Sequence, residues 1–384
     1  MKIKSFINID IDNKDLEESD RKKIKNLLKK QNPSLNDEVE QIWYLMDKVW
    51  EKYKCDNQKL NWKNISKFYN HPVWVLNGLF IEQHEISILQ RKSIAKWLFE
   101  NNITKIADYG GGFGTLARII SKTTKKSHID IYEPHPSSYT LKVLKDYSNI
   151  KIIDNLVKKY ECIISTDVLE HVIDPLEHFY NMIEKVKKNG FLIIANCFEP
   201  VMQCHLPQTF HLKHTFNYFA KEFGLENLGN LKGSHATIYK KTKNIKPNWE
   251  NIKAQEKMSQ YFFNYINKFI PKKINKNLEF SFNINKIIKN LNSLDSNLKY
   301  IIYGSGTGAN LILNFSKLDI EFILDKNENK HQTKMNDIFI YNPKKIKIPK
   351  NTIILISVFG KEDTITKELQ NKYNIAEENI RILL

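Results

Sequence analysis

The sequence predicts an α/β protein with two parallel sheets preceded by a helical region, and three features carry this prediction. From residue 103 onward, short apolar runs alternate with helical stretches, which is typical of parallel strands joined by crossover helices. The same alternation begins again at residue 299, and in both series a glycine-rich loop follows a strand. We therefore expect a helical region at 1–100, a core at 101–240, a helical connector at 241–298 and a smaller α/β domain at 299–384.

The period of the apolar residues places the individual elements. Residues 37–53 and 86–100 repeat at helical spacing, with a break at Pro72 between them, and 116–122 continue the first glycine loop as a helix. The core strands are expected at 103–107, 129–132, 150–153, 162–165 and 191–195. A Lys- and Asn-rich helical connector, interrupted at Pro271, precedes tail strands expected at 300–303, 320–324 and 353–358.

Composition limits the class of protein. Of the 384 residues, 41% are hydrophobic, which is enough to build buried cores. No apolar run approaches the roughly 18–20 residues of a membrane span, and the first residues lack the apolar core of a signal peptide. The four cysteines include no C-x-x-C pair, so neither a zinc knuckle nor a redox motif is expected. We expect a soluble, cytoplasmic protein with no bound metal.

The formal net charge of +16 raises the question of a nucleic-acid partner. Nearly all the basic residues are lysines, and only four arginines are present. Proteins that read bases or clamp phosphates usually depend on the bidentate geometry of arginine. The abundance of Lys, Asn and Ile fits an AT-rich genome, so nucleic acid is not the expected partner.

The first glycine loop favours a cationic cofactor. Its glycines at 110, 112 and 114 have the spacing i, i+2, i+4, whereas the dinucleotide fingerprint has i, i+2, i+5. Asp108 precedes the loop, where a carboxylate would repel a pyrophosphate and attract a positive charge. S-adenosylmethionine carries an ammonium and a sulfonium and no phosphate. We therefore predict that Asp108, Gly110, Gly112 and Gly114 bind this cofactor rather than NAD.

Further polar residues follow the later strands of the core. Glu133 ends the second strand, where a carboxylate can accept hydrogen bonds from ribose hydroxyls, and Asp154 follows the third, within possible reach of the adenine amino group. Asp167, Glu170 and His171 follow the fourth strand, near the expected ligand edge of the sheet. Each has an alternative interpretation. Glu133 could be a solvated acid at a strand end, and Asp154 an Asp favoured by a turn. Glu170 and His171 could simply begin a helix.

These residues together resemble a known family. The run IADYGGGFGTLA at 106–117, then Glu133, then STDVLEHVIDP at 165–175 resembles class I S-adenosylmethionine-dependent methyltransferases. The resemblance covers about residues 100–240. It implies a Rossmann-like core of seven strands, and the one departure is Gly111, where many members have Cys.

The resemblance also implies roles for particular residues. Asp108, Gly110 and Gly112 would line the methionine part of the donor, and Glu133 would bind its ribose. The segment after the fifth strand faces the acceptor in this family, and here it contains three histidines. Transfer to a hydroxyl needs a proton acceptor, which a neutral imidazole can supply.

We predict His214 as this base, or failing that His211 or His171. A packed or surface histidine and a three-histidine metal site that includes His205 are the alternatives.

The second glycine loop has the dinucleotide spacing. Gly304, Gly306 and Ala309 stand at i, i+2 and i+5, and Asp325 ends the next strand. The unit is about half of a full dinucleotide fold. We therefore predict that Gly304, Gly306 and Asp325 help to bind the acceptor, through a phosphate held at a helix start. The alternatives are a tight turn without a ligand and an NAD-linked oxidoreductase.

The order of the two α/β units is similar to that of two-domain sugar methyltransferases, which act on nucleotide-linked deoxysugars. This chain lacks their N-terminal cysteine zinc module, which puts C-methylation in doubt. We expect methyl transfer in carbohydrate biosynthesis, to a sugar that is nucleotide-linked or a surface-glycan precursor. An oxidoreductase using the second loop and a non-enzymatic scaffold are the alternatives. The acceptor, the methylated atom and the oligomeric state stay open.

Overall fold

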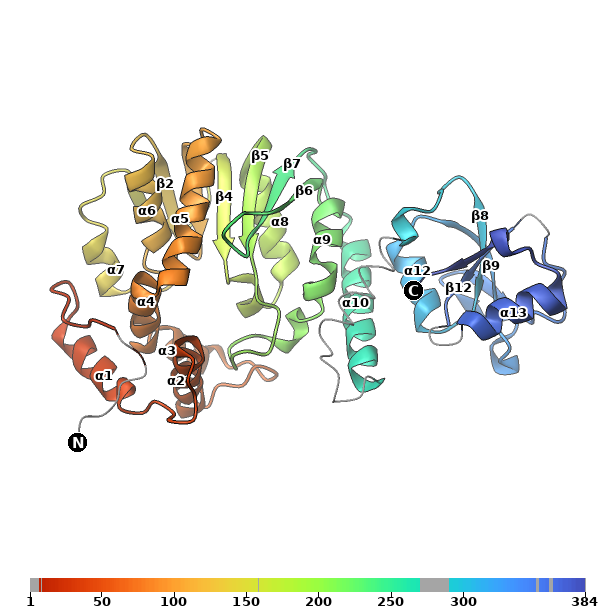
Figure 1. Ribbon diagram of the computed structural model, residues 1–384, viewed down its shortest axis with the longest axis horizontal. Helices are drawn as coiled ribbons and strands as arrows, with labels where there is room; N and C mark the ends of the chain where they lie inside the picture. The colour runs from red at the N-terminus through yellow and green to blue at the C-terminus, as the bar shows by residue number, and fades with distance from the viewer. Residues whose placement is uncertain are drawn as a thin grey trace. The chain divides into compact units, whose positions relative to one another are not determined.

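The computed structural model describes residue 7 and residues 9–157, 159–269, 290–349, 352–358 and 362–383. The chain divides into two compact units, Met1–Pro247 and Asn248–Leu384. The first holds the predicted helical region and the first sheet, and the second holds the smaller sheet (Figure 1).

Five helices precede the first sheet: α1 (Glu18–Leu28), α2 (Glu38–Lys52), α3 (Trp62–Tyr69), α4 (Val73–Gln83) and α5 (Glu85–Glu100). The two helices predicted from apolar spacing are present as α2 and α5, and α4 begins directly after Pro72. Asp37 caps α2 by accepting hydrogen bonds from the backbone of Val39 and Glu40. The apolar faces of α1 to α4 form a core of their own around Trp50 and Phe68.

The first sheet has seven strands in the order β3-β2-β1-β4-β5-β7-β6, all parallel except β7. They are β1 (Lys105–Tyr109), β2 (His128–Tyr132), β3 (Ile150–Ile153), β4 (Tyr160–Thr166), β5 (Val186–Ala195), β6 (Leu225–Asn230) and β7 (Thr237–Lys241). The predicted seven-stranded Rossmann-like core is confirmed. The strand predicted at 103–107 begins two residues later, and β6 and β7 were not located from sequence.

Helices cover both faces of this sheet (Figure 1). On one face, α5 and α6 (Thr115–Thr123) pack on an apolar core that includes Ile106, Ile164 and Ile193. On the other face lie α8 (Pro175–Lys185) and α9 (Leu212–Glu222), whose Phe179 and Phe216 rings contact each other and Tyr239 of β7. A short helix, α7 (Ser138–Val143), follows β2. The loops after β1, β2, β4 and β5 therefore meet at one edge of the sheet.

The second unit contains a six-stranded sheet in the order β10-β11-β9-β8-β12-β13. Its strands are β8 (Lys299–Tyr303), β9 (Asp319–Leu324), β10 (Lys334–Met335), β11 (Ile338–Tyr341), β12 (Ile353–Ile356) and β13 (Ile380–Ile382). Its helices are α10 (Trp249–Phe269), α12 (Thr307–Phe315) and α13 (Glu362–Tyr373). The three predicted strands are present as β8, β9 and β12.

The predicted connector is helical over α10, which contacts α12 of the second unit. Pro271 lies outside the described residues. Within the part of the chain that the structure describes, no helix combines the length and apolar character needed to span a membrane.

Candidate active site

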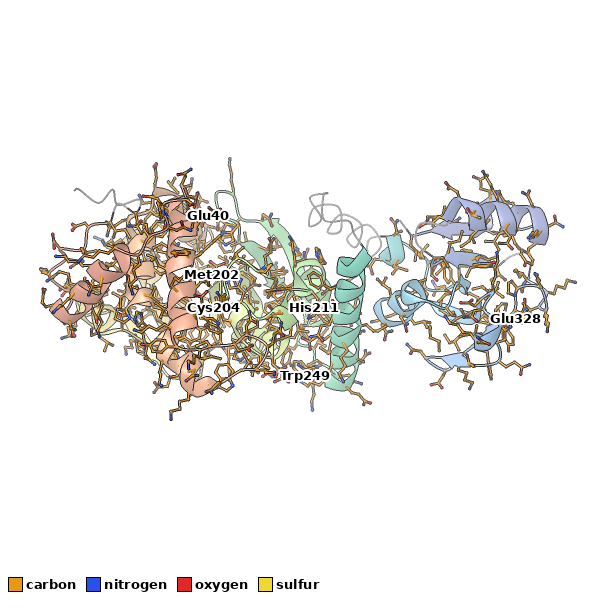
Figure 2. All side chains as sticks on the ribbon, turned by 90° about the horizontal axis from the view of Figure 1, so that it is seen from below. Glu40, Met202, Cys204, His211, Trp249 and Glu328 are labelled. Atoms are coloured by element: carbon orange, nitrogen blue, oxygen red, sulfur yellow. The ribbon has the colours of Figure 1, made fainter. Side chains whose placement is uncertain are left out.

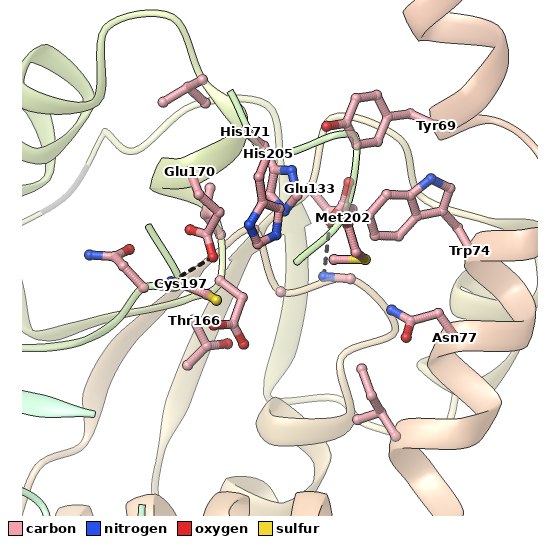
Figure 3. A pocket seen from close by; sticks show the side chains of 18 of the residues that line it. Tyr69, Trp74, Asn77, Glu133, Thr166, Glu170, His171, Cys197, Met202 and His205 are labelled. Carbon is pink, nitrogen blue, oxygen red and sulfur yellow. Dashed lines mark hydrogen bonds between the residues drawn. The ribbon is translucent and has the colours of Figure 1, made fainter. Parts of the chain in front are cut away.

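A cavity of about 1330 Å³ opens at the edge of the first sheet where the loops after β1, β2, β4 and β5 meet. Side chains of α3 and α4 form its opposite wall (Figure 3). The predicted site residues that line it are Asp108, Gly110, Gly112, Glu133, Asp167, Glu170 and His171. Of the predicted site residues in the first unit, those outside the lining are Gly114, Asp154, His211 and His214.

The glycine loop contains backbone conformations that other residues rarely adopt. Gly110 has φ +75°, and a Cβ there would lie 2.4 Å from Val168 Cγ2. Gly112 has φ +53°, and no atom lies within 4 Å of the place its Cβ would take, so the space beside it is open to a ligand. A Cβ on Gly114 would meet Leu144 at 2.9 Å. Gly114 therefore serves close packing at the start of α6.

Asp108 is a buried carboxylate at the end of β1. Its side chain is 2% exposed, and Oδ2 has no hydrogen-bond partner among the described residues. Burial raises the pKa of Asp108 to about 7, with Arg91 opposing the rise and Glu133 adding to it. A cation placed beside Oδ2 would supply the missing partner and favour the ionised form.

Glu133 follows β2 and is held by two backbone groups. Its Oε2 accepts a hydrogen bond of 2.9 Å from the Gly112 N–H (Figure 3), and its Oε1 accepts one of 2.9 Å from the His135 backbone N–H. These contacts fix the carboxylate at the rim of the open space beside Gly112.

Two further predicted acids differ in position. Asp167 follows β4 with φ +56°, and its Oδ1 lies 3.5 Å from His235 Nε2 across the cavity lining. The Asp167 carboxylate raises the pKa of His235. Asp154 is exposed and lies outside the cavity lining, so the geometry does not support its predicted contact with adenine.

Of the three predicted bases, only His171 lines the cavity. His211 and His214 stand at the start of α9, 1% and 5% exposed, and lie outside the lining. Burial lowers the pKa of His211 to about 3 and that of His214 to about 4. His205, which the sequence offered only as part of a possible metal site, lines the cavity instead.

His205 and His171 lie side by side, with ring centroids 4.8 Å apart (Figure 3). Glu170 is fully buried next to them; its Oε1 accepts a 2.8 Å hydrogen bond from the Cys197 N–H. The other oxygen of Glu170 has no partner among the described residues. Desolvation lowers the pKa of His171 to about 4, so its imidazole is neutral at pH 7.

The segment that carries His205 is held against the N-terminal helices. The Gln203 N–H donates to Asp47 Oδ1 at 2.8 Å, and Met202 and Cys204 pack on the apolar core of α1 to α4 (Figure 2). The helical region is thus part of the site, because it sets the position of this loop.

The sequence matches known families in two places. Residues 78–227 match a family described as "Methyltransferase domain", and residues 296–381 match one described as "C2185-like, N-terminal". A Rickettsia prowazekii protein named ubiquinone biosynthesis O-methyltransferase is 27% identical over 150 residues, which cover 35% of this chain and 59% of that protein. The chain contains a class I S-adenosylmethionine-dependent methyltransferase domain.

Other proteins are similar to this chain over part of its length. The counterpart from Rickettsia typhi is also 27% identical, and the chain spans about three fifths of both curated relatives. Human N-acetylserotonin methyltransferase has a TM-score of 0.36 at 11% identity, covering 53% of this chain and 67% of that one. A putative caffeoyl-CoA O-methyltransferase from Staphylococcus aureus has a TM-score of 0.32 at 16% identity, covering 40% and 82%.

The donor side of the methyltransferase cavity fits S-adenosylmethionine. The unpartnered Asp108 oxygen suits the donor ammonium, and Glu133 at the rim suits the ribose hydroxyls. The space beside Gly112 admits a ligand against the backbone. The cofactor supplies an electrophilic methyl group when bound, and these are the residues that would hold and orient it.

The acceptor side has an aromatic wall that sequence reasoning missed. Tyr69 of α3 and Trp74 of α4 stack with ring centroids 5.2 Å apart, and both present an edge-on contact to His171 at 6.4 Å and 6.3 Å (Figure 3). Trp43 and Trp62 also line the cavity. The concentration of tryptophans in the N-terminal helical region was the one feature of the sequence that could have indicated this aromatic wall.

The glycine loop of the second unit has a related arrangement. Gly304 has φ +100°, and a Cβ there would lie 2.3 Å from Val358 Cγ2. The space beside Gly306 is open. Asp325 Oδ2 accepts a 2.8 Å hydrogen bond from the Ser305 N–H, as Glu133 does from Gly112 in the first unit. The predicted roles of Gly304, Gly306 and Asp325 in binding an acceptor stay predictions.

Proposed function

We propose that this protein transfers the methyl group of S-adenosylmethionine to a hydroxyl oxygen of a small, ring-shaped acceptor, for which a nucleotide-linked or glycan-precursor sugar is our first candidate. The observation that carries the proposal is a single cavity. It joins the donor acids Asp108 and Glu133 to a wall of aromatic rings and to the neighbouring histidines His171 and His205.

The choice of oxygen as the methylated atom rests on His171, on the side of the cavity away from the donor acids. As the acceptor oxygen bonds to the methyl carbon, the carbon–sulfur bond breaks, S-adenosylhomocysteine leaves, and the hydroxyl proton must go elsewhere. Neutral His171 offers a lone pair for that proton, and such a base contributes typically 10²–10⁴-fold in rate. The curated relatives are both named O-methyltransferases, which agrees with this choice.

The ring shape of the acceptor follows from Tyr69 and Trp74. Flat apolar side chains cover the face of a ring and leave its hydroxyls for polar partners. For the second unit we propose that Gly304, Gly306 and Asp325 bind the phosphate or ribose of a nucleotide. Hydride transfer from tightly bound NADH to a carbonyl would instead support the oxidoreductase alternative for that unit.

The test uses the full chain with methyl-labelled S-adenosylmethionine and three acceptor groups: nucleotide sugars, free sugars and dihydroxybenzenes. Mass spectrometry should find one added methyl on an oxygen. Trp74→Ala should raise the acceptor KM at least about tenfold with donor Kd unchanged, whereas the exposed Phe99→Ala should change neither. Donor binding without label on any acceptor would support the scaffold alternative, and label on nitrogen or carbon would refute the choice of oxygen.

A further inference from the structure

We propose that the turn between β6 and β7 completes the donor site: its His235, together with Arg91 of α5, binds the carboxylate of the donor's methionine part. Both side chains line the cavity, as do the acids Asp108 and Asp167. Neither Arg91 nor His235 was predicted from sequence as a donor residue. The acceptor plays no part in this site.

Arg91 faces the cavity as a cation without an ion pair. Its Nη1 donates to the Ser87 carbonyl at 3.0 Å, and among the described residues no carboxylate oxygen lies within 4.0 Å of its guanidinium. Burial lowers the pKa of Arg91, and the charges of Asp167 and Asp108 oppose that fall. A guanidinium has five N–H donors in a planar fork. A carboxylate that enters the cavity would therefore find a bidentate partner.

Asp108 and Arg91 are arranged as the two ends of an α-amino acid require. The ammonium nitrogen and the carboxylate carbon of such a group lie about 2.5 Å apart, because both are bonded to one carbon. Their partners must therefore be near each other without touching. The Arg91 charge opposes the rise in the pKa of Asp108, yet the two side chains form no ion pair. A ligand held by its ammonium at Asp108 Oδ2 can thus offer its carboxylate to Arg91.

His235 brings a second positive charge to the same part of the cavity. Asp167 Oδ1 lies 3.5 Å from His235 Nε2 and raises the pKa of the ring, whereas the Arg91 charge lowers it. When His235 is protonated, its charge and that of Arg91 repel each other in the free protein. A carboxylate between the two offsets this repulsion and gives each of them a hydrogen-bond acceptor.

The backbone of the turn is fitted to α5. The Leu231 N–H donates to the Ala236 carbonyl at 2.8 Å, and both side chains pack on the apolar core that α5 shares with the sheet. Gly233 has φ +82°, and a Cβ there would lie 2.5 Å from Ser93 Oγ of α5. Gly233 lies outside the cavity lining. It is therefore a positioning residue, which lets the turn and its histidine approach α5.

The experiment compares two ligands of the full chain by titration calorimetry. One is S-adenosylhomocysteine, and the other is its decarboxylated analogue, which keeps the amine and lacks the carboxylate. Because both carry the ammonium, a change at Asp108 alters both affinities alike, and their ratio isolates the carboxylate. Wild type should prefer S-adenosylhomocysteine about 10–150-fold, which is the contribution of a charge-assisted hydrogen bond.

Two pairs of variants test the two elements. Arg91→Met should lower the ratio about tenfold, whereas Lys92→Met, which removes an exposed charge of α5 outside the lining, should not change it. His235→Gln should lower the ratio about two- to fivefold, because solvent screens the half-exposed ring. Gly233→Ala should lower it in the same direction. Gly229→Ala, also at positive φ in this hairpin but with no atom within 4 Å of its Cβ, should not.

Three results would overturn the proposal. A wild-type ratio near one would remove the carboxylate site. Equal loss of both ligands in Arg91→Met would make Arg91 only a counter-charge of Asp108. A ratio that His235→Gln and Gly233→Ala leave unchanged would exclude the turn from the donor site. Retained affinity for the decarboxylated analogue shows that a variant is folded. Failure of methyl transfer to every tested acceptor, with these ratios as expected, would contradict the proposed function alone.

Discussion

Replacing Asp108 by Asn should stabilise the free protein and weaken donor binding, because the same buried charge has opposite effects in the two states. The folded pKa of Asp108 is raised from 3.8 to about 7 by burial. A carboxyl with a raised folded pKa contributes its full stability below the unfolded pKa and loses it as the pH rises through the folded value. Above about pH 7 the ionised form therefore costs the free protein on the order of a few kcal/mol.

Asn has nearly the same shape and no charge, so it removes this cost. The Asp108→Asn protein without donor should unfold at a higher temperature than wild type at about pH 8. The difference should shrink as the pH falls and disappear well below the unfolded pKa of 3.8, where the wild-type carboxyl is protonated in both states. Thermal unfolding across this range measures the effect.

Donor affinity should change in the other direction. Losing a charge-assisted hydrogen bond to the donor ammonium costs about 1.5–3 kcal/mol, or roughly 10–150-fold in Kd. Wild-type affinity for S-adenosylhomocysteine should also fall up to about tenfold per unit as the pH drops below 7, because binding requires the ionised carboxylate.

Calorimetry at about pH 6 and pH 7.5 checks both points, with the exposed Asp154→Asn as a matched control that changes neither. An Asp108→Asn protein that binds like wild type, with the same pH dependence, would refute the assignment of Asp108 to the ammonium.

Three further predictions test the donor loop and its supports. Glu133→Gln should weaken S-adenosylhomocysteine binding about tenfold, measured by calorimetry, because the ribose hydroxyls lose a charged acceptor; an unchanged Kd would contradict that role. Gly110→Ala should lower the free energy of unfolding by about 1–3 kcal/mol more than Gly112→Ala does. Both residues have positive φ, but only a Cβ at Gly110 also clashes with Val168. Equal losses in denaturant titrations would refute this. Arg118 of α6 forms an ion pair with Glu82 of α4, and both side chains are largely buried. Arg118→Met should therefore cost about 2–3 kcal/mol in the same titrations, because it leaves the Glu82 carboxylate without a cation; a loss below about 0.5 kcal/mol would mean that solvent screens the pair.

The sequence by itself located the first five strands of the core sheet and the acid and glycine loop predicted to bind the donor. Strands buried on both faces are continuous apolar runs, so β1 to β5 could be located without a structure. Asp108 and the glycine loop are neighbours in the chain, so their relation is local. β6 could not be found in this way, because five of its six residues are exposed and it has no apolar run.

Only the tertiary structure decided which side chains line the cavity beside the predicted donor residues. His211 and His214 belong to the start of α9, which packs on the sheet and turns them into the interior. His205 lies in a loop that hydrogen bonds attach to α2 and to the segment before α3. The aromatic wall of Tyr69 and Trp74 stands about a hundred residues from His171 in sequence. Such contacts depend on the direction in which a packed helix turns each residue and on which loops meet at the sheet edge, and neither is a property of any local stretch of sequence.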